Sequence, residues 1–225
     1  MARCAEAWYW PGLLPGLPRL TARPVPGGWR LDGQAPWVSG WGYVHLLVVV
    51  ARGPRDSVVT LLADAQDQPG LTAERQRLTA ADASATVRLG FGGVFVPADR
   101  YVGQQPFDPV RQQHEGLRLN GSLALGVGRR CCALIGPSAL DGELRRRRTG
   151  LDGATTETMP LARARASEFA ARAAHALAVQ HGSASALAGD DAERLAREAL
   201  FLLVFGSRPA IKEALFGQLT GERSG

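Results

Sequence analysis

The hydrophobic pattern of the 225-residue chain changes near Pro106, and this change restricts the fold more than any other feature. Before it, apolar and polar residues alternate in short runs such as 86–96, which is typical of half-buried strands. After it, apolar residues recur at helical spacing. Strands followed by helices indicate an α+β fold. We predict a β-barrel domain over residues 1–103, a linker over 104–112 and an antiparallel helical bundle over 113–225.

Short strands are expected wherever an alternating run is bounded by residues that favour turns. They cover residues 43–51, 57–63, 71–78 and 86–96. Gly92-Gly93 in the last of them predicts a bulge or a bend. Residues 1–26 are rich in Pro and Gly, which predicts irregular backbone or an edge strand.

The stretch 27–42 holds three tryptophans among glycines, Trp29, Trp37 and Trp41. Its turn signal Asp32-Gly33 predicts a tight hairpin turn after a short strand. The spacing alone is compatible with core aromatics at the end of a sheet, because a buried Trp needs only one partner for its N–H. The alternative is that the indoles lie on glycine-flanked loops, with their faces open to a flat ligand.

Helical signals in the second half begin with apolar spacing at Leu119, Leu123, Val127 and Leu134. Further helices are predicted over 138–148 with Ser138 as cap, over 160–180 with Gly182 as stop, over 192–205 with Asp190 or Asp191 as cap, and from Ser207 or Pro209 to 219. Amphipathic helices joined by short connections are typical of an antiparallel bundle.

The stretch 27–42 resembles the middle β-domain of acyl-CoA dehydrogenases, dipeptide for dipeptide. That family has a Gly-x-x-Leu-x-Gly hairpin followed by a Trp-Ile-Thr/Ser-Asn loop, whose Trp and hydroxyl residue lie against the flavin ring. The matching residues are Trp37 and Ser39, with Gly40 in the Asn place. Residues 83–86 likewise resemble a family loop that ends Ser-x-Thr. The resemblance implies that Trp37 and Ser39 contact FAD.

The helical half resembles the same family at three places. Residues 193–199 look like its x-Arg-Leu-x-Arg-Asp-Ala helix. His181-Gly182-Ser183 stands where the family has a Gly-Gly turn near the cofactor, which implies cofactor contacts for Gly182 and Ser183. The four arginines 145–148 are typical of a solvated helix end. By resemblance, one of them stands instead near a family Arg that reaches a cofactor phosphate of the neighbouring subunit.

The family's catalytic carboxylate lies in a Tyr-Glu-Gly-Thr turn before its final helix. Here the turn reads Phe205-Gly206-Ser207-Arg208, so Gly206 stands at the Glu position and the catalytic base is unassigned. Glu198 is an alternative carboxylate, although a helix-surface role is expected for it, as for Asp141. The resemblance also implies that the family's N-terminal helical domain, part of the acyl-CoA cleft, is absent from this chain.

The resemblance spans about residues 20–219 and implies an acyl-CoA dehydrogenase-like flavoprotein. Its reaction would be the FAD-dependent oxidation of an acyl-CoA thioester in fatty acid metabolism. The alternatives are a non-catalytic partner subunit of a full-length acyl-CoA dehydrogenase and an inactive truncated homologue. We expect a homodimer, or a hetero-oligomer with a longer homologue, to cover apolar residues near Leu117, Leu123 and Leu200.

Charge and rare residue types argue against other functions. The formal net charge of +5 comes almost wholly from Arg, and no interleaving of aromatic and basic residues predicts a nucleic-acid surface. The four histidines lack metal-ligand spacing, so we predict no metal site. Adjacent Cys131 and Cys132 are expected to be buried in a helix. No leader or membrane-spanning run is recognised, which indicates a cytoplasmic protein.

Overall fold

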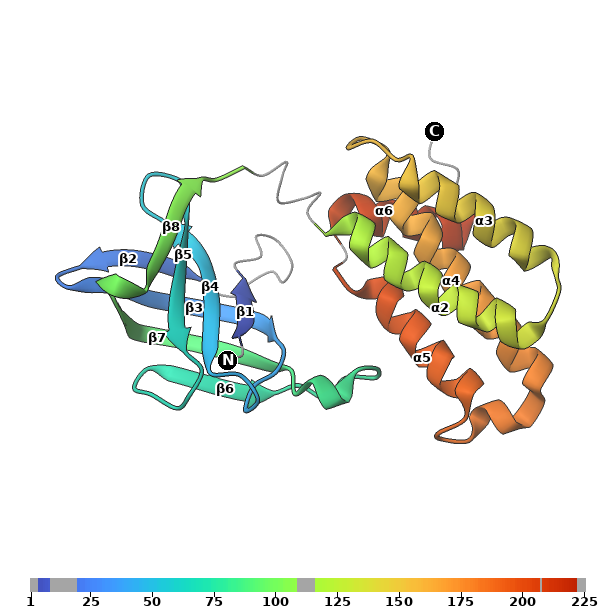
Figure 1. The fold of residues 1–225 in the computed structure, drawn as a ribbon, viewed down its shortest axis with the longest axis horizontal. Coiled ribbons are helices and arrows are strands. Elements are labelled where there is room, and N and C mark those ends of the chain that lie inside the picture. The colour runs from blue at the N-terminus through green and yellow to red at the C-terminus, as the bar shows by residue number, and fades with distance from the viewer. Residues whose placement is uncertain (1–3, 9–19, 109–115, 207, 222–225) are drawn as a thin grey trace. The chain divides into compact units, whose positions relative to one another are not determined.

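The computed structural model describes residues 4–8, 20–108, 116–206 and 208–221. The chain divides into two compact units, 1–108 and 109–225. Figure 1 shows strands in the first unit and helices in the second, so the predicted α+β class is confirmed. None of the helices so described combines the length and the apolar character that crossing a membrane requires.

Eight strands form one sheet in the described part of the first unit. They are β1 Cys4–Trp8, β2 Thr21–Val25, β3 Gly28–Val38, β4 Leu46–Gly53, β5 Ser57–Asp64, β6 Leu71–Arg75, β7 Val87–Pro97 and β8 Tyr101–Pro106. The order is β6-β7-β3-β2-β4-β5-β8, with β1 paired to β4. β1 and β2 run parallel to β4, whereas the other neighbours are antiparallel, so the sheet is mixed.

The sheet is open in the residues that the structure describes. β6 and β8 lie at its two ends, and no described pairing joins them. The described strands therefore form an open mixed sheet, and the closed barrel that we predicted is not shown among them. Short strands and turn signals are common to both architectures, because closure depends on long-range pairing between the edge strands. Residues 104–106, which we predicted to begin the linker, continue β8.

β3 runs straight through the tight turn that we predicted at Asp32-Gly33. The chain reverses instead at Pro26-Gly27, between β2 and β3, where Gly27 has a φ of +79°. Asp32 lies at a register shift between β3 and β7, and Gly33 has a φ of +120°. The residues that signalled a turn therefore continue β3, opposite the point where β7 carries an extra residue.

β7 shows how the sheet builds its core. Its buried side chains are Val87, Leu89 and Phe91, followed by Val94 and Val96. The pairing with β3 passes directly from Gly92 to Val94, so Gly93 is an extra residue, with a φ of +75°. The predicted bulge is confirmed, and it shifts the inward-facing positions by one residue so that both halves of β7 face the core.

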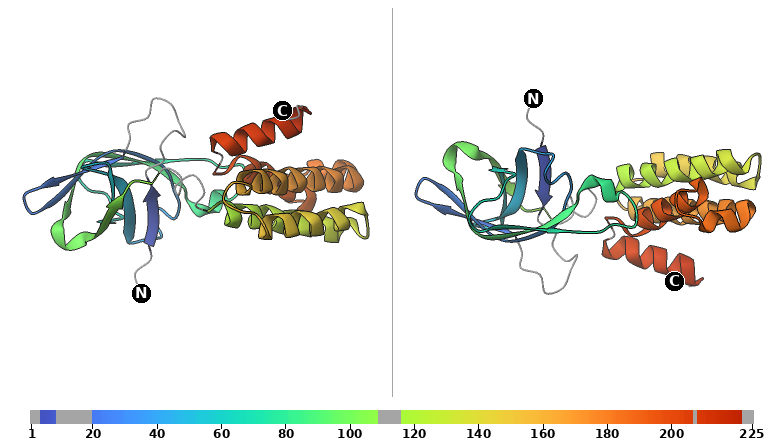
Figure 2. Two further views of the ribbon diagram at one scale, coloured as in Figure 1. Left: turned by 90° about the horizontal axis from the view of Figure 1, so that it is seen from above. Right: turned by 90° about the horizontal axis from the view of Figure 1, so that it is seen from below.

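Five helices form the described part of the second unit, α2 Leu117–Ile135, α3 Ala139–Asp152, α4 Met159–His181, α5 Asp191–Val204 and α6 Pro209–Thr220. Figures 1 and 2 show α2, α3 and α4 side by side. The predicted capping residues are confirmed at two helix starts, since Ser138 N–H donates to the Asp141 carboxylate at 2.9 Å and Asp190 accepts from Ala192 N–H at 2.8 Å. Gly182 ends α4 as predicted. α3 runs to Asp152, beyond the predicted end.

Of the apolar stripe from which we predicted α2, Val127 packs against the core, but the three leucines are exposed. Leu119 is 64% exposed and Leu123 is 48% exposed. The packed face carries small residues instead: a Cβ at Gly128 would lie 2.7 Å from the Phe169 ring, and one at Gly121 would lie 2.8 Å from Leu151 Cδ1. The packed face of α2 therefore combines these glycines, which let α3 and α4 approach closely, with the buried Leu117 and Leu125.

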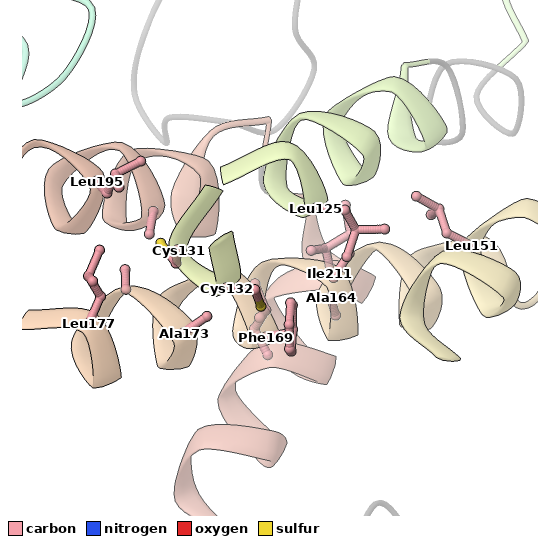
Figure 3. Close-up of a cluster of buried hydrophobic side chains, with 14 of the residues drawn as sticks. Leu125, Cys131, Cys132, Leu151, Ala164, Phe169, Ala173, Leu177, Leu195 and Ile211 are labelled. Atoms are coloured by element: carbon pink, nitrogen blue, oxygen red, sulfur yellow. The ribbon is translucent and has the colours of Figure 1, made fainter. Parts of the chain in front are cut away.

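The core of the helical unit lies between α2 and the helices that pack on it. Figure 3 shows Cys131 and Cys132 of α2 among apolar side chains that include Phe169 and Leu195. Both thiols are free, and burial raises the pKa of Cys131 to about 11. Burial also raises the pKa of Cys132. The predicted burial of the two cysteines is confirmed.

Candidate functional site

Trp37 lies within β3 and not on the glycine-flanked loop that we predicted. Its side chain is 45% exposed, whereas the neighbouring Pro36 and Val38 are buried. Trp29 and Trp41 pack against the core of the sheet. The core-aromatic interpretation therefore applies to Trp29 and Trp41, and it is wrong for Trp37, which is 45% exposed.

A chain of hydroxyl groups fixes the residues that follow Trp37. Ser39 Oγ lies 2.8 Å from Thr86 Oγ1, which lies 2.8 Å from Ser84 Oγ. The N–H of Gly40 donates to the carbonyl of Ser84 at 2.7 Å. Ser84 and Thr86 were not among the candidate residues, although the Ser-x-Thr likeness pointed to their segment. The structure joins Ser84 to Ser39, which is exposed, through Thr86, which is buried.

The segment 76–86 holds an uncommon backbone conformation next to Ser39. Ala81 has a φ of +59° and Ala85 a φ of +49°, a region that residues with a Cβ seldom adopt. The N–H of Gln76 donates to the Thr86 carbonyl at 3.0 Å, and its side-chain amide donates to the Pro36 carbonyl. Such conformations persist where the surrounding contacts fix them, and they are frequent at ligand sites.

Asp82 organises the same segment from within. Its carboxylate accepts the N–H of Leu78 at 2.9 Å, and the guanidinium groups of Arg77 and Arg75 lie 3.3 Å and 3.6 Å from it. The Leu78 hydrogen bond, with smaller help from the two arginines, holds the pKa of Asp82 below its usual range. The carboxylate therefore holds the loop in shape.

Gly182 and Ser183 lie in the second unit, where α4 ends. Gly182 has a φ of +73°, its N–H donates to the Ala178 carbonyl, and a Cβ there would meet nothing within 4 Å. Ser183 is exposed in the short 3-10 helix Gly182–Ala186. The backbone of this turn is thus open to a ligand. His181 nearby lies 3.2 Å from Asp190, which ties the turn to the start of α5.

The arginine run lies in the middle of α3, and its members have different roles. Arg147 pairs with Glu143 at 2.7 Å, and Arg148 donates to Ser122 Oγ at 3.1 Å. Arg145 and Arg146 line an open groove of about 630 Å³ together with Gly142, Thr149 and Gly150. A Cβ at Gly142 would lie 3.5 Å from Arg146 Nη1 and 3.9 Å from Arg145 Nη2.

Two guanidinium groups therefore converge over Gly142, and no described carboxylate forms an ion pair with either of them. Like charges that converge without a carboxylate between them favour an anion, and a guanidinium matches the geometry of phosphate oxygens. The interpretation of this run as a helix end is wrong, because α3 continues to Asp152, whereas the expected exposure holds for Arg145 and Arg146.

The turn after α5 carries no carboxylate. Gly206 has a φ of +60°, and a Cβ there would lie 2.8 Å from the side-chain nitrogen of Asn120. Glu198 is paired with Arg194 at 2.6 Å, and Glu193 with Arg197 at 3.0 Å, so the expected helix-surface roles are confirmed. Asp141 caps α3.

Within the described residues, no group of three or more His, Cys, Asp or Glu side chains is placed to hold a metal ion. The four implied cofactor contacts fall into two pairs, Trp37 with Ser39 in the first unit and Gly182 with Ser183 in the second. Each pair is exposed within its own unit.

No family model matches the sequence. Benzylmalonyl-CoA dehydrogenase of Aromatoleum aromaticum is a curated relative, 28% identical over 114 residues, which make up 48% of this chain and 30% of that protein. The match thus spans less than a third of the curated relative's length.

Solved structures show the same fold at low identity. The protein FkbI, of methoxymalonyl extender unit biosynthesis for the polyketide Fk520, has a TM-score of 0.74 and 19% identity, over 97% of this chain and 70% of its own. Glutaryl-CoA dehydrogenase of Mycobacterium smegmatis, in complex with FADH2, has a TM-score of 0.70 and 18% identity, over 98% and 66%. Butyryl-CoA dehydrogenase of Megasphaera elsdenii has a TM-score of 0.73 and 15% identity, over 97% and 68%.

Proposed function

We propose that the chain is an acyl-CoA dehydrogenase-like flavoprotein that binds FAD and an acyl-CoA thioester. Its fold is that of acyl-CoA dehydrogenases over the β and C-terminal helical domains, as the resemblance implied. The observation that carries the proposal is the open indole of Trp37 beside the fixed hydroxyl of Ser39, at the positions where the resemblance implies flavin contacts.

The residues of the first unit fit a flat, polar-edged ring. Trp37 offers an aromatic face, and such stacking contributes about 0.5–1.5 kcal/mol beyond area burial. Ser39 offers a hydroxyl whose direction is set by Thr86 and Ser84, so little side-chain freedom is lost on binding. When bound, FAD would supply the electron acceptor of the oxidation, and these residues would hold and orient its ring.

The residues of the second unit fit the anionic part of an FAD molecule. Arg145 and Arg146 present two guanidinium groups over Gly142 in an open groove. Phosphate oxygens accept hydrogen bonds from guanidinium groups in a bidentate manner. Gly182 and Ser183 would add an open turn with a free hydroxyl. In the family the phosphate-binding Arg comes from the neighbouring subunit, so this assignment also favours an oligomer.

A second candidate is favoured by the turn at Gly206. General-base catalysis contributes typically 10²–10⁴-fold, and glycine has no side chain to accept a proton. The same turn is filled by Asn120, an amide that is not basic. We therefore expect little dehydrogenation of simple acyl-CoAs by the chain alone. This makes a non-catalytic partner subunit of a longer acyl-CoA dehydrogenase the alternative to an enzyme in its own right.

The experiment is purification followed by absorbance spectroscopy and titration with FAD. A yellow protein, or saturable FAD binding after the chain is stripped of flavin, is the expected result. Arg146→Ala should weaken FAD binding, whereas Arg129→Ala should not, because Arg129 is an exposed arginine of α2 outside the groove. Equal FAD affinity in both variants would remove the groove from the proposal, and a chain that binds no FAD would reject the proposal itself.

A further inference from the structure

Trp37 is exposed because β3 carries a bulge at this point. The register of β3 against β7 shifts between Ala35 and Val38. Pro36 and Trp37 lie there opposite a single residue of β7, Arg88. In a regular strand alternate side chains face the same side, so Trp37 would follow Ala35 into the core. The extra residue gives the inward position to Val38, which is 0% exposed, and turns the indole outward, as bulges next to active sites do.

The carbonyl before the indole is bonded by a side chain from another segment. A bulge interrupts the ladder of hydrogen bonds between two strands. The side-chain amide of Gln76 donates to the Pro36 carbonyl, and the two residues are 40 positions apart in the chain. Gln76 thus supplies a bond at the residue before Trp37, where the ladder is interrupted. This bond ties the bulged backbone to the loop that follows β6.

Gln76 is itself held in position. Its backbone N–H donates to the Thr86 carbonyl at 3.0 Å, and the residue is half-buried. The same loop holds the chain beyond Trp37, because the Ser84 carbonyl accepts the Gly40 N–H at 2.7 Å. Trp37 therefore lies between two attachments to one loop. A group held in this way loses little freedom when a ligand binds, and such preorganisation raises affinity.

We infer that Gln76 is a positioning residue for the flavin ring, because it holds the bulge that presents Trp37. The inference rests on the proposed function, which makes FAD the ligand of that indole. Gln76 acts through the backbone of Pro36, and the indole makes the contact with the ring. Without the amide the bulged backbone loses this attachment, so the indole is held less firmly. The share of FAD affinity that depends on Gln76 can therefore be no larger than the share that depends on Trp37.

The test is the equilibrium affinity of the full chain for FAD, together with the fluorescence of the bound flavin, which a stacked indole quenches. Gln76→Met keeps the length of the side chain and removes the donor. It should weaken FAD binding about 2- to 10-fold, the effect of one hydrogen bond, and leave the bound flavin more fluorescent. Gln76→Glu keeps the shape but places a carboxylate opposite the carbonyl at pH 7, so it should weaken binding at least as much.

A double-variant cycle tests whether Gln76 acts through the indole. In Trp37→Ala, the further change Gln76→Met should leave FAD affinity unchanged, because the side chain that Gln76 positions is absent. An equal loss in the presence and in the absence of the indole overturns the inference, since a general weakening of the fold would act in both.

Controls separate the inference from its premise. Gln68→Met removes a similar bond, from the Gln68 amide to the Asp64 carbonyl at 3.0 Å, and it should leave FAD affinity unchanged. Thermal unfolding identifies the variants that are folded, and one folded variant of Gln76 suffices for the test. Unchanged affinity and fluorescence in that variant overturn the inference while the proposed function stands. Failure of the unmodified chain to bind FAD overturns both.

Discussion

The guanidinium of Arg172 on α4 lies 2.7 Å from the carboxylate of Glu143 on α3, and the same carboxylate accepts from Arg147 at 2.7 Å. Glu143 therefore links α3 to α4 through its ion pair with Arg172. Partial burial raises the pKa of Glu143, but the hydrogen bonds from Arg172 and Arg147 outweigh it and hold the pKa below its usual range. The group therefore stabilises the folded state when it is ionised.

The ion pairs of Glu143 predict how the free energy of unfolding depends on pH. A carboxyl with a lowered pKa in the folded state contributes stability above its unfolded pKa, near 4.5, and loses it as the pH falls through the folded value. Glu143→Gln should lower the free energy of unfolding by about 1 kcal/mol at pH 7 and by less at pH 3. Denaturant unfolding at both pH values measures the difference. An equal loss at both would show that charge is not the cause.

Gly206→Ala should destabilise the helical unit. The positive φ of Gly206 disfavours a Cβ, and that Cβ would also meet the Asn120 amide. We expect a loss of about 1–3 kcal/mol in the free energy of unfolding. Adding Asn120→Ala should recover the part that arises from the steric contact, leaving the backbone strain. Strictly additive effects in the double variant would contradict the contact between the two residues.

Trp37→Ala should loosen FAD roughly tenfold, or about 1.4 kcal/mol. Stability should change little, because the side chain is 45% exposed. Trp29→Ala is the matched comparison, since Trp29 stacks on Tyr101 at 5.7 Å and packs against the core. It should lower the thermal unfolding midpoint instead. Equilibrium dialysis and calorimetric melting measure the two effects, and an unaltered FAD affinity in Trp37→Ala would remove this residue from the flavin surface.

Cys131 and Cys132 should resist thiol reagents in the folded chain. Burial raises the pKa of both thiols, so the reactive thiolate is scarce at pH 8 as well as inaccessible. In a Cys4→Ser background, an aromatic disulfide reagent should react slowly until denaturant is added. Rapid reaction of either thiol under native conditions would indicate that α2 opens from its neighbours far more readily than its packing implies.

Self-association is expected through the apolar residues that the second unit leaves exposed. Leu123 of α2 is 48% exposed and Leu200 of α5 is 51% exposed. The third residue that we expected there, Leu117, is 1% exposed and belongs to the core. Leu123→Glu with Leu200→Glu should convert an oligomer to a monomer in light scattering at micromolar concentration. An unmodified chain that is already a stable monomer would count against this surface.

The sequence predicted element type and most helix ends, because these follow from local signals. Ser138, Asp190 and Gly182 act at helix termini as their residue types indicate. It did not predict which face of α2 is buried, because that depends on how closely α3 and α4 approach. Nor did it predict whether the sheet closes, which depends on pairing between strands far apart in the chain.

The candidate site also contains residues that a local motif identifies and contacts that no local motif identifies. Trp37 and Ser39 were recognisable from a local motif, but their surroundings were not. The hydroxyl chain through Thr86 joins residues 47 positions apart, and Asn120 meets Gly206 from another helix. Contacts of this kind form only in the folded chain and produce no periodic pattern in the sequence.

A Cβ at Gly121 or Gly128 of α2 would lie 2.8 Å from Leu151 or 2.7 Å from Phe169, so these side chains would have to move. The two glycines are seven residues apart, or about two helical turns, so both lie along one line of the helix. A shift of α2 by one turn would bring Ala124, Leu125, Cys131 or Cys132 to the place of Gly128, and each of them carries a Cβ. The two glycines thus act as notches that set the axial position of α2. Asn120 is the neighbour of Gly121. The distance from Asn120 to the turn at Gly206 therefore depends on the absence of a Cβ at Gly121.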